Sequence, residues 1–277
     1  MPVDNIHQLI DWQPPITRPI IEGGILDPET RLMVFGHAKS WKSMLALHTS
    51  FALAEGSPWF GFNTRPMTVL KYQVELPKAI DRKRVIKYAR GRDSYPATLF
   101  FQTPQERVKL DSSWGMQALQ RDIVEAQSRA PDTHLVLILD PLYKLMAGHI
   151  SDEYDVKKFQ DNIDELKTKY CFTVIIIHHA RLTRVDPGGT VIDLGSEELM
   201  GSSYWNNWFD SIVRVKVTNP YTGGDTVAMT FELTRNSEFM LPRIDIHWRR
   251  EDLQPVVIRR EELETDPSIQ IIKEDVE

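Results

Sequence analysis

A chain of 277 residues, 42% of them hydrophobic, is long enough to bury a core of its own, so it needs no disulfide or structural metal to fold. Its single cysteine, Cys171, excludes an internal disulfide and a multi-cysteine zinc site, and the apolar run that follows predicts a small buried side chain. The net charge of −6 argues against a protein coated in basic charge for nucleic-acid binding, although it leaves room for a ring with a few basic residues in its channel.

The sequence carries no sign of a membrane span or of a leader. No apolar run approaches the roughly 20 residues that cross a bilayer. The start, Met1-Pro2-Val3-Asp4, lacks the basic and apolar segments of a signal peptide. We therefore expect a soluble, cytoplasmic protein with no membrane partner, and the cysteine usage agrees with this.

Strands alternate with helices over the first two thirds of the chain. Residues 1–20 contain three prolines and are predicted to be an extended lead-in. Strands are expected at 31–35, 67–74, 134–139 and 172–177, and helices at 42–54, 78–90, 114–129 and 154–169. The last two strands are continuous apolar runs, which is typical of a parallel sheet covered on both faces. The pattern predicts an α/β fold with a doubly wound, mainly parallel sheet flanked by helices.

The pattern changes to short strands after residue 208. Strands are expected at 211–217, 226–233 and 244–248, and Gly223-Gly224-Asp225 predicts a hairpin between the first two. The segment 251–277 is charged and has no apolar period, so it is predicted to be a tail. The main domain is therefore expected at 21–250, with antiparallel strands at its C-terminal end.

A phosphate-binding loop is predicted between the first strand and its helix. A Walker A loop consists of Gly, four residues, Gly, Lys and then Ser or Thr, and residues 36–43 fit except at Trp41, which replaces the second glycine. Such a loop needs backbone N–H groups around a phosphate, a lysine for the β- and γ-phosphates and a hydroxyl for magnesium. Lys42 and Ser43 supply the last two. The predicted nucleotide-binding residues are Gly36, Ala38, Lys39, Ser40, Trp41, Lys42, Ser43 and Met44.

Trp41 is the one departure from the loop pattern. Glycine at this position relieves crowding, so tryptophan must adopt a compatible backbone, and we expect its ring to turn outward. The alternative for the whole segment is an ordinary strand, turn and helix with a chance Lys-Ser pair. The strand ends further along the chain weigh against that alternative.

Two carboxylates follow strands downstream of this loop. Asp140 ends the apolar strand 134–139, where a P-loop ATPase keeps the acid that orients the magnesium shell. Glu75 ends the strand 68–74, where a carboxylate could polarise an attacking water as a general base. Taken alone, either acid could equally be a strand-end residue in solvent.

A histidine pair, His178-His179, ends the strand 172–177. Adjacent residues on a strand point to opposite faces, so the two rings cannot easily share a metal ion. A hydrogen bond from one of them to a γ-phosphate is the better interpretation. Because ligands of open α/β sheets bind at the carboxyl ends of the strands, we expect Glu75, Asp140 and His179 near the loop.

The order and spacing of these motifs resemble RecA-like ATPases, and most closely the plasmid RepA hexameric replicative helicases and related phage ATPases. The resemblance covers about residues 20–250. The matching stretches are GGIL at 23–26, GHAKSWKSMLALHTSFALAEG at 36–56, WFGF at 59–62, VLKYQVE at 69–75, LVLILDPL at 135–142, VIIIHHARL at 174–182, GSSYWNNWFD at 201–210 and FELTRNS at 231–237.

The resemblance implies ATP and Mg²⁺ as ligands, a homo-oligomeric ring, expected to be a hexamer, and single-stranded DNA as a partner. Position by position, Glu75 resembles the catalytic glutamate, Asp140 the Walker B aspartate and metal ligand with Ser43, and His179 the γ-phosphate sensor. Arg235 lies where DnaB-type helicases keep an arginine finger that reaches the neighbouring subunit's ATP. The lysine often found two residues earlier is Leu233 here, and an exposed arginine on a late strand can also be merely solvated.

Three functions remain open on the sequence alone. The first is a ring ATPase that acts as a DNA helicase in plasmid or phage replication. The second is a RecA-like ATPase that serves as a switch or assembly factor without helicase activity, which the acidic charge favours slightly. The third is a binding module that does not hydrolyse ATP, suggested by Trp41 and opposed by Glu75 and Asp140. The loop 181–200, which would face the channel, carries few basic residues and can also be a plain surface loop.

Overall fold

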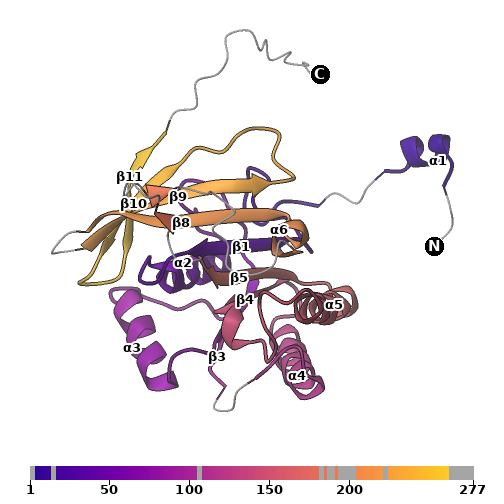
Figure 1. The fold of residues 1–277 in the computed structure, drawn as a ribbon, viewed down its shortest axis with the longest axis horizontal. Helices are drawn as coiled ribbons and strands as arrows, with labels where there is room; N and C mark the ends of the chain where they lie inside the picture. The colour runs from indigo at the N-terminus through magenta and orange to yellow at the C-terminus, as the bar shows by residue number, and fades with distance from the viewer. Residues whose placement is uncertain are drawn as a thin grey trace, which may run out of the picture.

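The structure, a computed structural model, contains one nine-stranded sheet with helices on both faces (Figure 1). It describes residues 4–13, 17–104, 108–180, 184–185, 191–192, 204–220 and 224–261. Across the sheet the strands follow the order β11-β10-β9-β8-β1-β5-β4-β2-β3. Strands that are distant in sequence therefore lie side by side, as in a doubly wound fold.

The parallel part of the sheet runs from β8 to β3 and confirms the predicted alternation of strands and helices. None of the helices in the described residues is long and apolar enough to cross a membrane. The elements of this part are β1 (Arg31–Gly36), α2 (Lys42–Glu55), β2 (Thr68–Gln73), α3 (Lys78–Tyr88), β3 (Leu99–Gln102), α4 (Ser113–Arg129), β4 (Leu135–Asp140), η1 (Leu142–Lys144), α5 (Glu153–Tyr170) and β5 (Thr173–His179).

Beyond β8, which pairs with β1 in parallel, the C-terminal strands continue the sheet in antiparallel fashion, as expected. Two short strands form a separate antiparallel pair within the stretch expected to be a channel loop, most of which lies outside the described residues. These elements are β6 (Arg184–Val185), β7 (Val191–Ile192), α6 (Tyr204–Trp208), β8 (Ser211–Pro220), β9 (Gly224–Thr234), β10 (Ile244–Arg249) and β11 (Pro255–Arg260).

Two apolar layers cover the sheet, and alternate residues of each central strand enter one layer or the other. In β4, Val136 and Ile138 belong to the layer that α2 completes. Leu137 and Leu139 belong to the layer formed with α4 and α5, which lie together in Figure 1. Burial on both faces explains why β4 and β5 are continuous apolar runs.

Three local expectations are wrong. The lead-in expected to be extended contains a helix, α1 (Ile6–Asp11), because Asn5 and Gln8 form a reciprocal capping box. The segment expected to be a tail contributes β11, which pairs with β10. Cys171 is exposed rather than buried, since it ends α5 in a left-handed conformation with a φ of 48°. The domain limits at 20 and 250 otherwise stay predictions.

Candidate nucleotide-binding site

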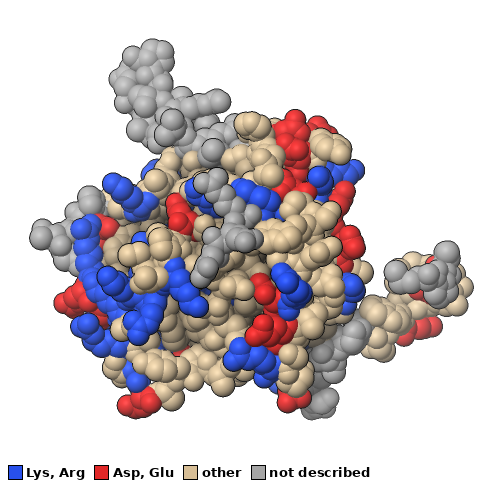
Figure 2. Space-filling model, turned by 90° about the horizontal axis from the view of Figure 1, so that it is seen from below, with Lys and Arg blue, Asp and Glu red and all other residues tan. Residues whose placement is uncertain are grey.

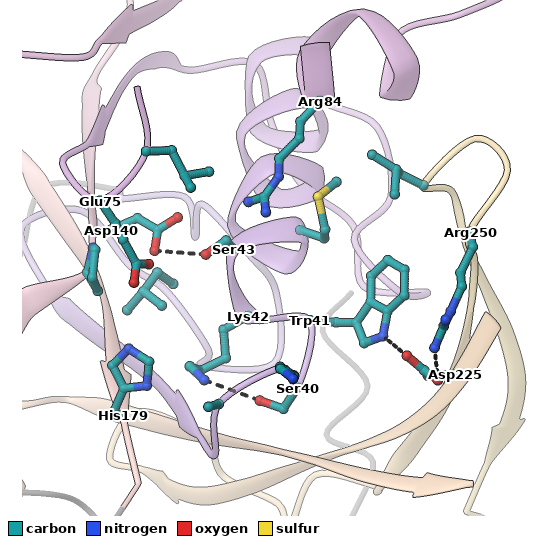
Figure 3. A pocket seen from close by; sticks show the side chains of 17 residues that line it. Ser40, Trp41, Lys42, Ser43, Glu75, Arg84, Asp140, His179, Asp225 and Arg250 are labelled. Carbon is teal, nitrogen blue, oxygen red and sulfur yellow. Dashed lines mark hydrogen bonds and ion pairs between the residues drawn. The ribbon is translucent and has the colours of Figure 1, made fainter. Parts of the chain in front are cut away.

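The carboxyl ends of four parallel strands meet beside the 36–43 loop. The register pairs Gly36 with His179 and Gln73 with Asp140. A cleft of about 570 Å³ opens at this edge of the sheet (Figure 3). Its walls include most of the residues singled out from the sequence: Ala38, Lys39, Ser40, Trp41, Lys42, Ser43, Met44, Glu75, Asp140 and His179.

The 36–43 loop has the backbone of a phosphate cradle. Lys39 and Trp41 have left-handed φ angles of 62° and 66°, and such alternation turns successive N–H groups toward one point. Gly36 is needed for close packing, because a Cβ there would lie 2.2 Å from the Val215 carbonyl oxygen. The loop runs directly into α2, whose N-terminus adds positive potential. This arrangement fits a phosphate group.

Trp41 has the left-handed backbone that favours glycine, but its ring does not turn outward as expected. The indole stacks on Trp248 of β10, with ring centroids 5.4 Å apart and planes at 11°. Its Nε1 donates to Asp225 Oδ2 at 2.5 Å, and Arg250 donates to the other carboxylate oxygen at 2.9 Å. A left-handed residue with a Cβ costs about 1 kcal/mol, which the stacking and the hydrogen bond offset. Trp41 thus ties the loop to the C-terminal strands.

We predict that Trp41→Gly leaves ATP affinity within about tenfold of the wild type, or roughly 1.4 kcal/mol. The glycine relieves backbone strain while the stack on Trp248 is lost, so the two effects oppose each other. Titration with a fluorescent ATP analogue measures the affinity. Trp248→Leu is the matched control, because it removes the stack and keeps the strained residue. A gain in affinity far above tenfold for Trp41→Gly would contradict the prediction and favour a naturally weak binding site.

Lys42 lies at the base of the loop and is buried. Its Nζ donates to the His37 carbonyl oxygen at 2.5 Å. It also donates to Ser40 Oγ at 3.3 Å (Figure 3). Burial lowers the pKa of Lys42 to about 8, and the carboxylates of Asp140 and Glu75 act in the opposite direction. At neutral pH the ammonium form still dominates, so Lys42 presents a positive charge to a phosphate in the cradle.

Asp140 and Ser43 face each other across the cleft. Ser43 Oγ donates to Asp140 Oδ1 at 3.1 Å, and this pair of hard oxygen ligands fits Mg²⁺. Gln73 Nε2 donates to the other oxygen, Oδ2, at 3.1 Å, and Lys71 Nζ lies 3.8 Å from it. Burial raises the pKa of the Asp140 carboxyl, while Lys71 and the Ser43 hydrogen bond favour the carboxylate. Lys71 and Gln73 were not among the site residues predicted from the sequence.

Glu75 and His179 also line the cleft, and both contact Tyr143. Tyr143 lies in η1, three residues after Asp140. The Tyr143 hydroxyl donates to Glu75 Oε1 at 2.9 Å. The Tyr143 ring packs edge-on against the His179 ring, with ring centroids 5.1 Å apart. Burial and the bond to Glu75 raise the pKa of Tyr143 to about 12, so the hydroxyl stays a donor at neutral pH. Burial and the charge of Lys42 lower the pKa of His179, which favours a neutral ring.

The two adjacent histidines point to opposite faces, as expected. His179 reaches the cleft, whereas His178 is buried on the other face and packs near the Trp205 ring of α6.

Arg235 is not part of the cleft. It follows β9 at the level of Ser211, which is the opposite end of the sheet from the loop. Its guanidinium donates to the carbonyl oxygens of residues 209 and 207, at 3.1 and 3.4 Å.

The outer rim of the cleft consists of residues that the sequence analysis did not select. Arg84 of α3 points into the cleft above Trp41, and Arg250 approaches from the turn between β10 and β11 (Figure 3). Leu253 of the same turn also lines the cleft. Lys87 of α3 donates to the Arg250 carbonyl oxygen at 2.6 Å and so joins the two sides of the rim. Only a basic helix that follows Glu75 within a few residues could have signalled Arg84 from the sequence.

Comparison with solved structures finds the same architecture elsewhere. One solved ATPase domain superposes with a TM-score of 0.62 at 12% identity, over 84% of this chain and 86% of that one. A DnaB-like replicative helicase, described with its interactions with primase, gives 0.60 at 10% identity, over 83% of this chain and 57% of its own. The KaiC-like protein PH0186 from Pyrococcus horikoshii OT3 superposes with a TM-score of 0.52 at 13% identity, over 87% of this chain and 94% of that one. These likenesses establish a RecA-like fold.

Comparison with the curated proteins gives no significant match. A family profile described as an AAA domain matches residues 2–184. That range is more than half of the chain and includes the phosphate loop, Glu75, Asp140 and His179, which the structure gathers around one cleft. The chain therefore belongs to this AAA domain family.

Proposed function

We propose that the chain binds ATP with magnesium through residues 36–43 and hydrolyses it in a homo-oligomeric ring that moves on single-stranded DNA, as a RepA-type replicative helicase. The observation that carries the proposal is the convergence of Lys42, Ser43, Asp140, Glu75 and His179 on one cleft. Family membership supports nucleotide use. The likeness to a solved ATPase domain and to a DnaB-like replicative helicase supports a motor of this kind, with a hexamer as the expected ring.

Nucleotide binding is assigned to the phosphate cradle and the acid beside it. The backbone N–H groups of the loop hold the phosphates, and the ammonium of Lys42 neutralises charge on the β- and γ-phosphates. Ser43 and Asp140 would hold Mg²⁺, which when bound neutralises phosphate charge and orients the γ-phosphate. Gln73 and Lys71 fix the second oxygen of Asp140, so its first oxygen keeps one orientation toward Ser43.

Hydrolysis is assigned to Glu75 and His179. The Glu75 carboxylate accepts a proton from the attacking water, and the Tyr143 hydroxyl positions the carboxylate by donating to Oε1. His179, whose neutral ring is favoured by its surroundings, donates one ring N–H toward the γ-phosphate. Arg235 is too far from the cleft of its own chain, so its proposed role requires a neighbouring subunit.

We predict that Glu75→Gln keeps ATP bound but slows hydrolysis by at least about a hundredfold, the usual scale for loss of a general base. The amide preserves the shape of the side chain and removes its basicity. Binding is measured with a fluorescent ATP analogue and turnover by phosphate release. Glu165→Gln, on the exposed face of α5, is the control for loss of one carboxylate. Simultaneous loss of binding and turnover in Glu75→Gln would point to a structural role.

A second function, a switch or assembly factor that hydrolyses ATP without moving on DNA, is favoured by the net charge of −6. The two functions differ in their response to DNA. ATPase rate is measured with and without single-stranded DNA, and oligomer mass is measured alongside. The motor requires stimulation by DNA in a ring-sized assembly. An ATPase rate that does not change when DNA is added would exclude the DNA motor and favour the switch or assembly factor.

A further inference from the structure

Helix α3 carries a concentration of positive charge that the ATPase chemistry does not use. The stretch 78–92 contains seven Lys and Arg residues and one acid, Asp81, in a chain whose net charge is −6. Asp81 is buried. Four of the basic side chains are exposed and lie outside the walls of the nucleotide cleft: Lys78, Arg82, Lys83 and Arg90, which together we call the α3 basic surface. Figure 2 shows Lys and Arg gathered on the side of the molecule where α3 lies.

No acidic side chain among the described residues neutralises the α3 basic surface. Arg92, at the end of the same stretch, pairs with Glu55. Across the described ranges of the chain, no carboxylate lies within ion-pair distance of the four residues that define the surface. Unpaired like charges held on one helix repel each other, and a polyanion relieves that repulsion. The surface is therefore suited to a ligand with several negative charges.

We propose that the α3 basic surface binds the phosphate backbone of a single nucleic-acid strand. On a helix, residues four apart are separated by about 6 Å along the axis, so Lys78 and Arg82 can contact successive phosphates. Arg90 extends the row beyond the helix end. Ile86, which is 49% exposed, lies between Arg82 and Arg90 in the chain, and Tyr95, which is 69% exposed, follows Arg90 by five residues, so both side chains are open to apolar contact with bases. This inference rests on the proposed DNA motor and assigns the contact to α3.

A membrane surface fits α3 less well. A basic helix that lies on lipid needs a free apolar face to insert, but the inner face of α3 is used within the protein. Tyr88 is buried, and Val85 packs against the core. The two large apolar residues that α3 exposes, Ile80 and Ile86, are six positions and about 120° apart around the helix, so they form no continuous apolar face. The charged side chains around them suit the rim of a nucleic-acid site.

The position of α3 would couple nucleic acid to ATP. The helix begins three residues after Glu75, and its Arg84 lines the nucleotide cleft. A strand held on the outer side of α3 therefore lies one helix diameter, about 10 Å, from the reaction site. A shift of the helix on binding would move Arg84 and the segment that carries Glu75 together.

The test is binding of fluorescein-labelled oligo(dT), followed by anisotropy at several salt concentrations. In the α3 variant Lys78, Arg82, Lys83 and Arg90 are each replaced by Gln. In the control variant Arg121, Lys157, Lys158 and Lys169, four exposed residues of α4 and α5, are each replaced by Gln, so the change in net charge is the same. We expect the α3 variant to bind at least about tenfold more weakly and the salt slope to fall by about 3, near 0.7 per lost phosphate contact. The control should change affinity less than about threefold.

Other measurements separate this inference from the proposed function. The ATPase rate without DNA should stay within about twofold of the wild type in the α3 variant, because none of its four positions lines the cleft. Equal DNA binding by the α3 and control variants would overturn the inference and leave the motor. No binding and no ATPase stimulation in the wild type would overturn both. Tighter binding of poly(glutamate) than of oligo(dT) would assign the surface to an acidic protein and also overturn the inference.

Discussion

Lys42→Ala is expected to abolish ATP binding at concentrations that saturate the wild type. Lys42 is the buried cation at the base of the cradle, and its Nζ is held by the His37 carbonyl oxygen at the point where the loop turns into α2. The alanine variant leaves the β- and γ-phosphates without a positive side chain inside the loop. Titration with a fluorescent ATP analogue measures the loss. Lys157→Ala, which removes an exposed lysine of α5, should bind as the wild type does.

The protonation state of Lys42 also predicts how ATP affinity depends on pH. Its pKa of about 8 without nucleotide means that raising the pH from 7 to 9 removes most of the ammonium. Bound phosphate favours the charged form, so ATP affinity should fall about tenfold over that range. The fall should be absent in Lys42→Arg, whose guanidinium stays charged at pH 9. Hydrolysis by Lys42→Ala at the wild-type rate would show that residues 36–43 are not the nucleotide loop.

The sequence was most informative where chain order alone determines position. The four predicted strands of the parallel part each lie within a few residues of their observed limits. Two of them, β4 and β5, are continuous apolar runs because they are buried on both faces. The parallel register then brings Gly36 beside His179 and Gln73 beside Asp140. The carboxyl ends of neighbouring parallel strands must share one edge, so this part of the cleft could be predicted without coordinates.

Other parts of the cleft depend on long-range packing that a single sequence does not reveal. Trp41 was expected to turn outward, and its actual partners, Trp248 and Asp225, lie about 200 residues away on the antiparallel strands. Lys71 was not predicted either, because a lysine in a strand is usually expected to face solvent. Strand β2 is covered on both faces, and its lysine is only 1% exposed. A charge buried in this way needs a partner, and Asp140 provides one.

Arg235→Ala is expected to keep ATP binding and oligomerisation and to lose on the order of a thousandfold in turnover, the scale of an arginine finger. The residue lies at the level of Ser211, near the amino end of β1, whereas the loop follows the carboxyl end of that strand. Several residues of strand at about 3.3 Å each separate the two ends, which is beyond the reach of an arginine within one chain. Turnover by phosphate release and oligomer mass are the measurements.

A structural role for Arg235 makes a different prediction, and mixing of variants separates the two. Its guanidinium holds two carbonyl oxygens between α6 and β8, so Arg235→Ala could instead loosen that connection. Arg235→Ala has an intact Glu75, and Glu75→Gln has an intact Arg235. In mixed head-to-tail rings about a quarter of the interfaces pair the intact cleft with the intact arginine, so activity should return in proportion. No recovery in rings whose mixed composition is verified by mass would refute action across the interface. Full activity of Arg235→Ala alone would remove the finger from the mechanism, whereas a lowered melting temperature without rescue would assign Arg235 to the connection between α6 and β8.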